Sequence, residues 1–155
     1  MERTSEDSFG EFRGSQPESQ ENIVFADPIP EFKDQQTELL QLKEQAKTFF
    51  LKKDFSQAYE KYKEALPLTE FKDDVATLHS NMTQCALNLN QTELALTHVH
   101  LALKSAQTEL PIVLRIKLKY RLAQALLRLR DFRKCKEVLK NLKTYCGMEH
   151  QDDMF

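Results

Sequence analysis

Basic and amide side chains recur about one helical turn apart in three separate segments of the chain. Residues three or four positions apart share a helix face, so each segment would present its donors together. Ammonium, guanidinium and amide groups donate hydrogen bonds to carboxylates, and none of these positions carries an acid. If the three segments stand side by side, as the repeat described below implies, they form a surface for a carboxylate-rich ligand, made of Lys43, Lys47, Asn81, Gln84, Lys117, Tyr120, Arg121, Gln124 and Arg128. The alternative is an ordinary solvated helix face, since Lys and Arg are common there.

The sequence contains no recognisable catalytic or metal-binding pattern. His98 and His100 are two positions apart, so their rings point to different sides of a helix. Cys146 and His150 lack a second pair at zinc-ligand spacing. No Gly-rich phosphate loop is present, and no Ser or Cys nucleophile has a recognisable base. We expect no enzymatic activity, no metal and no cofactor.

The 155 residues carry a net charge of −2, but acidic and basic residues are unevenly distributed along the chain. Residues 1–34 sum to −6, residues 35–145 to +7 and residues 146–155 to −3. A basic body between acidic tails favours acidic partners. Nucleic acid is the less favoured partner, because the basic residues form no recognised binding motif with exposed aromatics.

Composition favours a helical, cytoplasmic protein. The chain has three Gly and no Trp, with many Leu, Lys, Glu and Gln. No apolar run approaches the ~20 residues that span a bilayer, and the acidic start has no apolar core typical of a signal peptide. The three cysteines are scattered, which is typical of a reducing compartment; Cys85 and Cys135 are expected in the core.

The segment from Asp54 to Leu66 predicts one half of a helical hairpin. Ala58, Tyr62 and Ala65 follow i, i+4, i+7 spacing and place a small, a large and a small residue on one face. An apolar helical stripe precedes them across a short polar turn. The same spacing recurs 37 and then 40 residues further on, at Ala95, Val99, Ala102 and at Cys135, Leu139, Leu142.

Between about Gln36 and Tyr145 the chain resembles the tetratricopeptide repeat (TPR) family, whose period is about 34 residues. The first repeat has the family's signature residues at Leu42, Ala46, Phe49, Ala58, Tyr62 and Ala65. The later repeats are degenerate, with His79 and Lys119 where a large apolar residue is usual. The resemblance implies an all-α fold, a three-hairpin TPR-like α-solenoid. A generic helical bundle is the alternative.

Three regions are expected: a disordered acidic tail (1–33), the helical domain (34–146) and an acidic C-terminal tail (147–155). Asp34 would cap the first helix, Pro67 would end the second, and Pro111 would lie in the first turn of the fifth, which begins after Thr108. Gly147 would end the sixth. The expected helices cover about 34–51, 55–66, 73–89, 92–105, 109–129 and 132–145. No capping helix follows, so the last hairpin is expected to expose an apolar face, which the tail or a second copy could cover.

In the TPR family the first helix of each hairpin lines a concave groove. The predicted cations resemble the carboxylate clamp of co-chaperone TPR domains, which hold acidic C-terminal tails of the seventy- and ninety-kilodalton heat-shock chaperones. Lys43, Asn81, Lys117 and Arg121 match clamp positions, whereas Lys47 stands where an Asn is expected. The acidic end, residues 152–155, could also occupy the groove of its own or a neighbouring copy.

The N-terminal tail contains Phe9, Gly10, Glu11 and Phe12, which resemble the motif bound by gamma-adaptin ear domains of clathrin adaptors. The leading hypothesis is a non-enzymatic protein-protein interaction adaptor that binds an acidic C-terminal peptide in its groove, with a chaperone co-factor as its most concrete form. One alternative is a clathrin-adaptor accessory protein in vesicle trafficking. Another is a structural subunit of a larger complex.

Overall fold

The computed structural model describes residues 30–106 and 110–147, and over these residues the chain is all-α. The chain divides into two units, Met1–Asp34 and Gln35–Phe155. Its elements are α1 (Pro30–Leu51), α2 (Phe55–Ala65), the 3₁₀ helix η1 (Leu66–Leu68), α3 (Lys72–Asn88), α4 (Thr92–Ala106), α5 (Ile112–Arg128) and α6 (Phe132–Tyr145). None of the helices in the described part has an apolar stretch long enough to cross a membrane.

Two helix starts differ from the sequence prediction, and both involve proline. Helix α1 begins at Pro30, so Asp34 lies inside the helix and does not cap it; proline fits a first turn, where its missing N–H is not needed. Pro111 precedes α5 as its N-cap, with φ −51° and ψ 137°. Proline disfavours helical geometry in the residue before it, so α5 cannot extend back to Leu110. Because Pro111 itself has an extended ψ, the helix begins at Ile112. Thr108 lies outside the described residues.

The three helix pairs of the described chain share one turn geometry. Each turn has a residue in the left-handed region: Lys53, Asn90 and Arg130, with φ of 63°, 60° and 61°. The next residue in each turn donates its N–H to the carbonyl five positions earlier, over 2.9, 2.8 and 2.9 Å. This is the Schellman pattern of helix ends. The turns are 37 and 40 residues apart, as the side-chain pattern predicts.

Acidic side chains start the helices that follow the first and third turns. Asp54 accepts a hydrogen bond from the N–H of Gln57, and Asp131 accepts one from the N–H of Lys134, both at 3.2 Å. Each carboxylate satisfies a donor that the helix itself cannot pair. Asp54 and Asp131 therefore each donate the backbone hydrogen bond that ends the preceding helix and cap the next helix with their side chain. This double use keeps both turns short.

The small-large-small positions lie in the core of the first two pairs. Ala58, Tyr62 and Ala65 are buried, as are Ala95, Val99 and Ala102. Small residues let the next helix approach closely, and helices α2 and α4 pack against α3 and α5 respectively. Cys85 and Cys135 are buried, as predicted.

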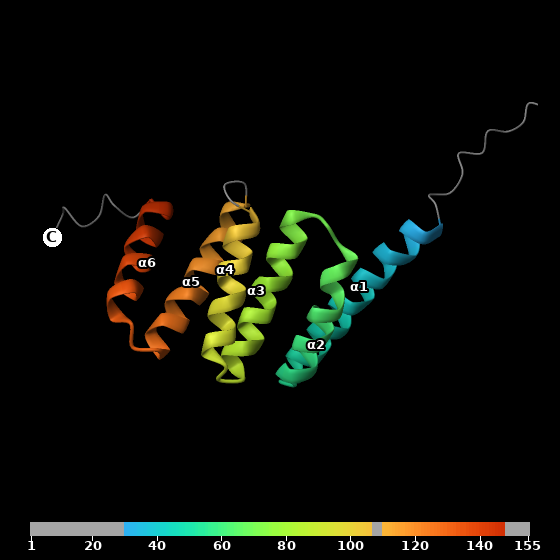
Figure 1. The fold of residues 1–155 in the computed structure, drawn as a ribbon, viewed down its shortest axis with the longest axis horizontal. Helices are drawn as coiled ribbons and strands as arrows, with labels where there is room; N and C mark the ends of the chain where they lie inside the picture. The colour runs from blue at the N-terminus through green and yellow to red at the C-terminus, as the bar shows by residue number, and fades with distance from the viewer. Residues whose placement is uncertain (1–29, 107–109, 148–155) are drawn as a thin grey trace, which may run out of the picture. The chain divides into compact units, whose positions relative to one another are not determined.

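Helix α6 departs from this pattern. Its Cys135 is buried, but Leu139 is 45% exposed. Helix α5 packs against α6, which lies at the edge of the array of helices in Figure 1. The prediction of an exposed apolar face on the last hairpin is confirmed by Phe132 and Leu139, which are both exposed.

A partly buried chain of polar side chains connects the first and second pairs. Tyr59 of α2 and the Nε2 of His98 of α4 are 2.9 Å apart, and the Nδ1 atoms of His98 and His79 are 3.1 Å apart. The two imidazoles are stacked. Facing Nδ1 atoms require one donor and one acceptor, so the contact favours two neutral rings. Burial, helped by His79, lowers the pKa of His98 to about 4, and burial also lowers the pKa of His79.

We predict that the free energy of unfolding falls as the pH falls from 7 to 5. The pKa of His98 is depressed in the folded state, so the unfolded chain binds the proton first, and the stabilisation present above about pH 6.5 is lost towards pH 4. The expected loss from His98 is about 2 kcal/mol between pH 7 and pH 5. Denaturant titrations at the two pH values measure it.

His98→Gln should remove most of this pH dependence, because the titrating ring is gone. His100→Gln is the matched control, on the same helix at an exposed position. A His98→Gln chain that keeps the full slope between pH 7 and pH 5 would contradict the prediction.

Candidate functional site

Contacts between α1, α3 and α5 keep a constant register. Lys43 of α1 contacts Asp74 of α3, 31 residues later, and Phe50 and Asn81, also 31 apart, line one pocket. Between α3 and α5, Arg121 contacts Ser80 and Arg128 contacts Leu87, each pair 41 residues apart. A constant offset means that the helices run in the same direction. The first helices of the three pairs are therefore parallel, with α3 between α1 and α5.

Arg121 joins α5 to α3. Its Nη1 donates to the backbone carbonyl of Ser80 at 2.6 Å and also to the Ser80 hydroxyl, and its Nε donates to the side-chain carbonyl of Gln84 at 3.2 Å. The guanidinium is only partly accessible, and burial lowers its pKa from the ordinary value. A guanidinium can meet three acceptors at once because its five donors are fixed in one plane.

A small pocket opens beside this guanidinium. Its volume is about 100 Å³, and it is lined by Phe50, Tyr62, Asn81, Gln84 and Arg121. Three of the predicted ligand-binding residues thus surround one space. A water occupies about 30 Å³ in the liquid, so the space suits a group as small as a carboxylate. The amides of Asn81 and Gln84 add donors to the positive charge of Arg121.

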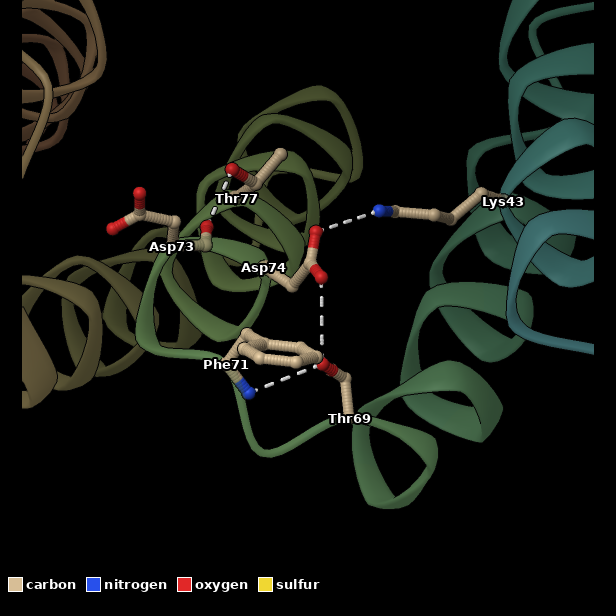
Figure 2. Close-up of polar contacts among 6 residues, drawn as sticks. All are labelled: Lys43, Thr69, Phe71, Asp73, Asp74 and Thr77. Atoms are coloured by element: carbon tan, nitrogen blue, oxygen red, sulfur yellow. Dashed lines mark hydrogen bonds and ion pairs between the residues drawn. The ribbon is translucent and has the colours of Figure 1, made fainter. Parts of the chain in front are cut away.

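Figure 2 shows that Lys43 is held by an acid of the same chain. Its Nζ lies 3.0 Å from Oδ1 of Asp74, and both side chains are partly exposed. The hydroxyl of Thr69 donates to the other oxygen of Asp74 at 3.4 Å, and the N–H of Phe71 donates to Thr69 Oγ1 at 3.2 Å. The segment after η1 and the start of α3 therefore fix the carboxylate opposite Lys43.

Asp74 is the residue of this surface that the sequence analysis missed. The predicted set contains no acid, yet Asp74 lies two helical turns before Asn81 on α3, at i and i+7. That spacing puts both on one helix face and could have revealed it. An acid at this place competes with any acidic ligand for Lys43.

The other predicted residues are divided between internal contacts and solvent. Arg128 donates to the backbone carbonyl of Leu87. The side-chain oxygen of Gln124 is buried, with no hydrogen-bond partner among the described residues. Four of the predicted residues are exposed on α1 and α5: Lys47, Lys117, Tyr120 and Arg128. Lys47 lies one turn after Lys43 on α1, and Lys117 lies one turn before Arg121 on α5. Because α3 lies between α1 and α5, the two lysines flank α3 on opposite sides.

Other predicted features lie outside the described residues: the motif Phe9, Gly10, Glu11 and Phe12, the acidic tails at 1–29 and 148–155, and His150. In the ranges 30–106 and 110–147, no three His, Cys, Asp or Glu side chains gather as metal ligands would. Cys146 is exposed.

Comparison with models of known protein families gives no match for the sequence, and comparison with curated proteins gives none either. The site therefore has to be interpreted from its own residues.

We predict that Arg121→Met lowers the free energy of unfolding by about 2–3 kcal/mol, because charge-assisted hydrogen bonds between α5 and α3 are lost. Lys117→Met, one turn earlier on α5 and exposed, is the matched control and should change stability by less than about 0.5 kcal/mol. Urea denaturation measures both. Equal effects of the two substitutions would show that Arg121 does not join the helices.

Proposed function

We propose that the chain is a non-enzymatic interaction module of TPR-like architecture that binds an acidic peptide segment along α1, α3 and α5. The observation that carries the proposal is the pocket in which Asn81, Gln84 and Arg121 meet. A peptide carboxylate placed there would receive donors from both amides and the guanidinium, in a partly desolvated position where such bonds are strongest.

The repeated turns support the TPR-like part of the proposal. Three identical helix ends, 37 and 40 residues apart, separate helices whose small-large-small faces pack alike in the first two pairs. A repeat of one supersecondary unit buries its apolar faces between neighbours and leaves one face of each unit for binding. The offsets of 37 and 40 residues exceed the TPR period of about 34. The extra residues lie at η1 and at the connection between α4 and α5.

Charge supports an acidic ligand. Lys47 and Lys117 are exposed on α1 and α5, the helices on either side of α3, and Arg121 lines the pocket. A peptide with several carboxylates could span these groups. Each exposed ion pair would add a modest contribution to the free energy of binding, and salt would weaken that contribution. The resemblance to a carboxylate clamp makes a chaperone's acidic C-terminal tail one candidate ligand, although Lys47 replaces the expected Asn.

The ion pair of Lys43 with Asp74 sets a condition on binding. A ligand carboxylate that contacts Lys43 must share the ammonium group with Asp74 or replace it. Replacement exchanges one ion pair for another, so little net energy is gained at this position. The proposed ligand therefore derives its affinity from the central pocket and from Lys47 and Lys117.

A second candidate, a structural subunit of a larger complex, is favoured by the exposed Phe132 and Leu139 of α6. Large apolar side chains grouped on one face are typical of protein interfaces. Recruitment to clathrin adaptors through Phe9 and Phe12, and a cytoplasmic location, stay predictions.

We predict that Lys47→Glu combined with Lys117→Glu weakens binding of a fluorescent Asp- and Glu-rich peptide about tenfold, equivalent to about 1.4 kcal/mol. Fluorescence anisotropy at constant ionic strength gives the affinity. Lys63→Glu combined with Lys104→Glu, at exposed positions on α2 and α4, changes the net charge by the same amount and is the control; it should have a much smaller effect. Equal losses in the two chains would mean that binding follows net charge and not this surface.

In the same assay, Asp74→Asn should strengthen peptide binding, because the competing carboxylate beside Lys43 is removed. Asp73→Asn changes charge by the same amount at the neighbouring exposed position and serves as its control. If Asp74→Asn has no greater effect than Asp73→Asn, Lys43 takes no part in peptide binding.

A further inference from the structure

Helix α6 carries an apolar groove with a basic rim. The groove has a volume of about 400 Å³ and is lined by Phe132, Cys135, Lys136, Leu139, Lys140 and Lys143. Phe132 is 61% exposed and Leu139 is 45% exposed. The three lysines follow i, i+4, i+7 spacing and so lie along one side of the helix.

The position of Leu139 in the repeat shows what the groove lacks. The residues at the same place in α2 and α4 are Tyr62 and Val99, which are 7% and 0% exposed. Helix α3 packs against α2 and covers the first, and α5 packs against α4 and covers the second. Within the described residues no helix follows α6, so the equivalent surface has no cover. An additional segment of this chain or of another would bury it in the same way.

The residues directly after α6 have the complementary composition. Residues 148–155 contain three acids and no base, together with three large apolar residues: Met148, Met154 and Phe155. Carboxylates match a lysine rim, and methionine and phenylalanine suit an apolar floor. The segment is also joined to the helix, which reduces the entropy cost of docking relative to a separate molecule.

The lengths are compatible with this placement. Helix α6 has 14 residues, which corresponds to about 21 Å. Eight extended residues span up to about 26–29 Å, so the segment can run back along the whole groove. Gly147 has φ +68°, the left-handed conformation that ends a helix and redirects the chain.

We propose that residues 148–155 dock in the groove of α6, with Met154 and Phe155 against Phe132 and Leu139 and with Asp152 and Asp153 near Lys136 and Lys140. The segment then acts as the cover that α3 and α5 provide for the preceding pairs. This inference concerns a surface separate from the pocket around Arg121 and does not depend on the proposed function.

The thiol of Cys135 provides a direct test, because it lines the groove. Alkylation of the full chain, followed by mass spectrometry of each cysteine, compares wild type with Met154→Ser/Phe155→Ser. Cys135 is 6% exposed and lines the groove, so removing the apolar anchors should open its route to solvent and make its thiol react about fivefold faster or more. Cys85, buried between other helices, reports whether the fold is kept, and the exposed Cys146 reports the intrinsic reaction rate. An unchanged Cys135 rate with Cys85 still protected would overturn the proposal.

Charge reversal gives a second test with its own rescue. Lys136→Glu with Lys140→Glu should expose Cys135 to the same extent, and adding Asp152→Lys with Asp153→Lys should restore protection. Arg133→Glu with Lys104→Glu, two exposed positions outside the groove lining, changes the net charge by the same amount and is the matched control. Failure of the rescue would overturn the proposed pairing.

The alternative occupants give different results. If a second copy covered the groove, sedimentation would show a dimer, Phe132→Ser would dissociate it, and Met154→Ser/Phe155→Ser would leave Cys135 protected. These three results together would contradict docking of residues 148–155 and would indicate that a second copy covers the groove. A monomeric chain whose Cys135 protection requires residues 154 and 155 would support it.

Discussion

The arrangement of the candidate binding surface depends on how the guanidinium of Arg121 joins α5 to α3. One planar cation donates to the Ser80 carbonyl, the Ser80 hydroxyl and the Gln84 side chain. This fixes both the distance and the register between the two helices, because no other side chain combines so many donors in one rigid group. The same contact orients Gln84 towards the pocket it shares with Asn81. Positioning of the helices and formation of the candidate site therefore rest on one set of hydrogen bonds.

The repeated turns explain why such contacts can line up along the chain. In each pair the turn has one residue in the left-handed conformation and the same hydrogen bond, so α1, α3 and α5 end in equivalent ways. Parallel helices keep one sequence offset along their contact, 31 residues between α1 and α3 and 41 between α3 and α5, which places Lys43 opposite Asp74 and Arg121 opposite Ser80. The second helix of each pair supplies the small face on which the next pair packs. The last pair has no such neighbour among the described residues, and its apolar surface is exposed.

Much of the fold could be predicted from local pattern, because helical spacing and turn residues act over a few positions. Ala58, Tyr62 and Ala65 indicated a buried face, and Asp54 and Asp131 preceded helices. The pairing of Lys43 with Asp74 could not be predicted in the same way. It depends on the offset of 31 residues between α1 and α3, which is set by the length of the turn and of η1. The partly buried state of Arg121 likewise depends on how closely α5 approaches α3, which the sequence does not specify locally.

The central claim is that an acidic peptide binds where Asn81, Gln84 and Arg121 meet. Nuclear magnetic resonance of the isotope-labelled chain, titrated with an Asp- and Glu-rich peptide, tests it most directly. The account predicts that the side-chain amide signals of Asn81 and Gln84 and the Nε–H signal of Arg121 shift together and saturate with one affinity. Peptide-induced shifts confined to other surfaces, such as the lysines of α6, with these three signals unmoved, would contradict it.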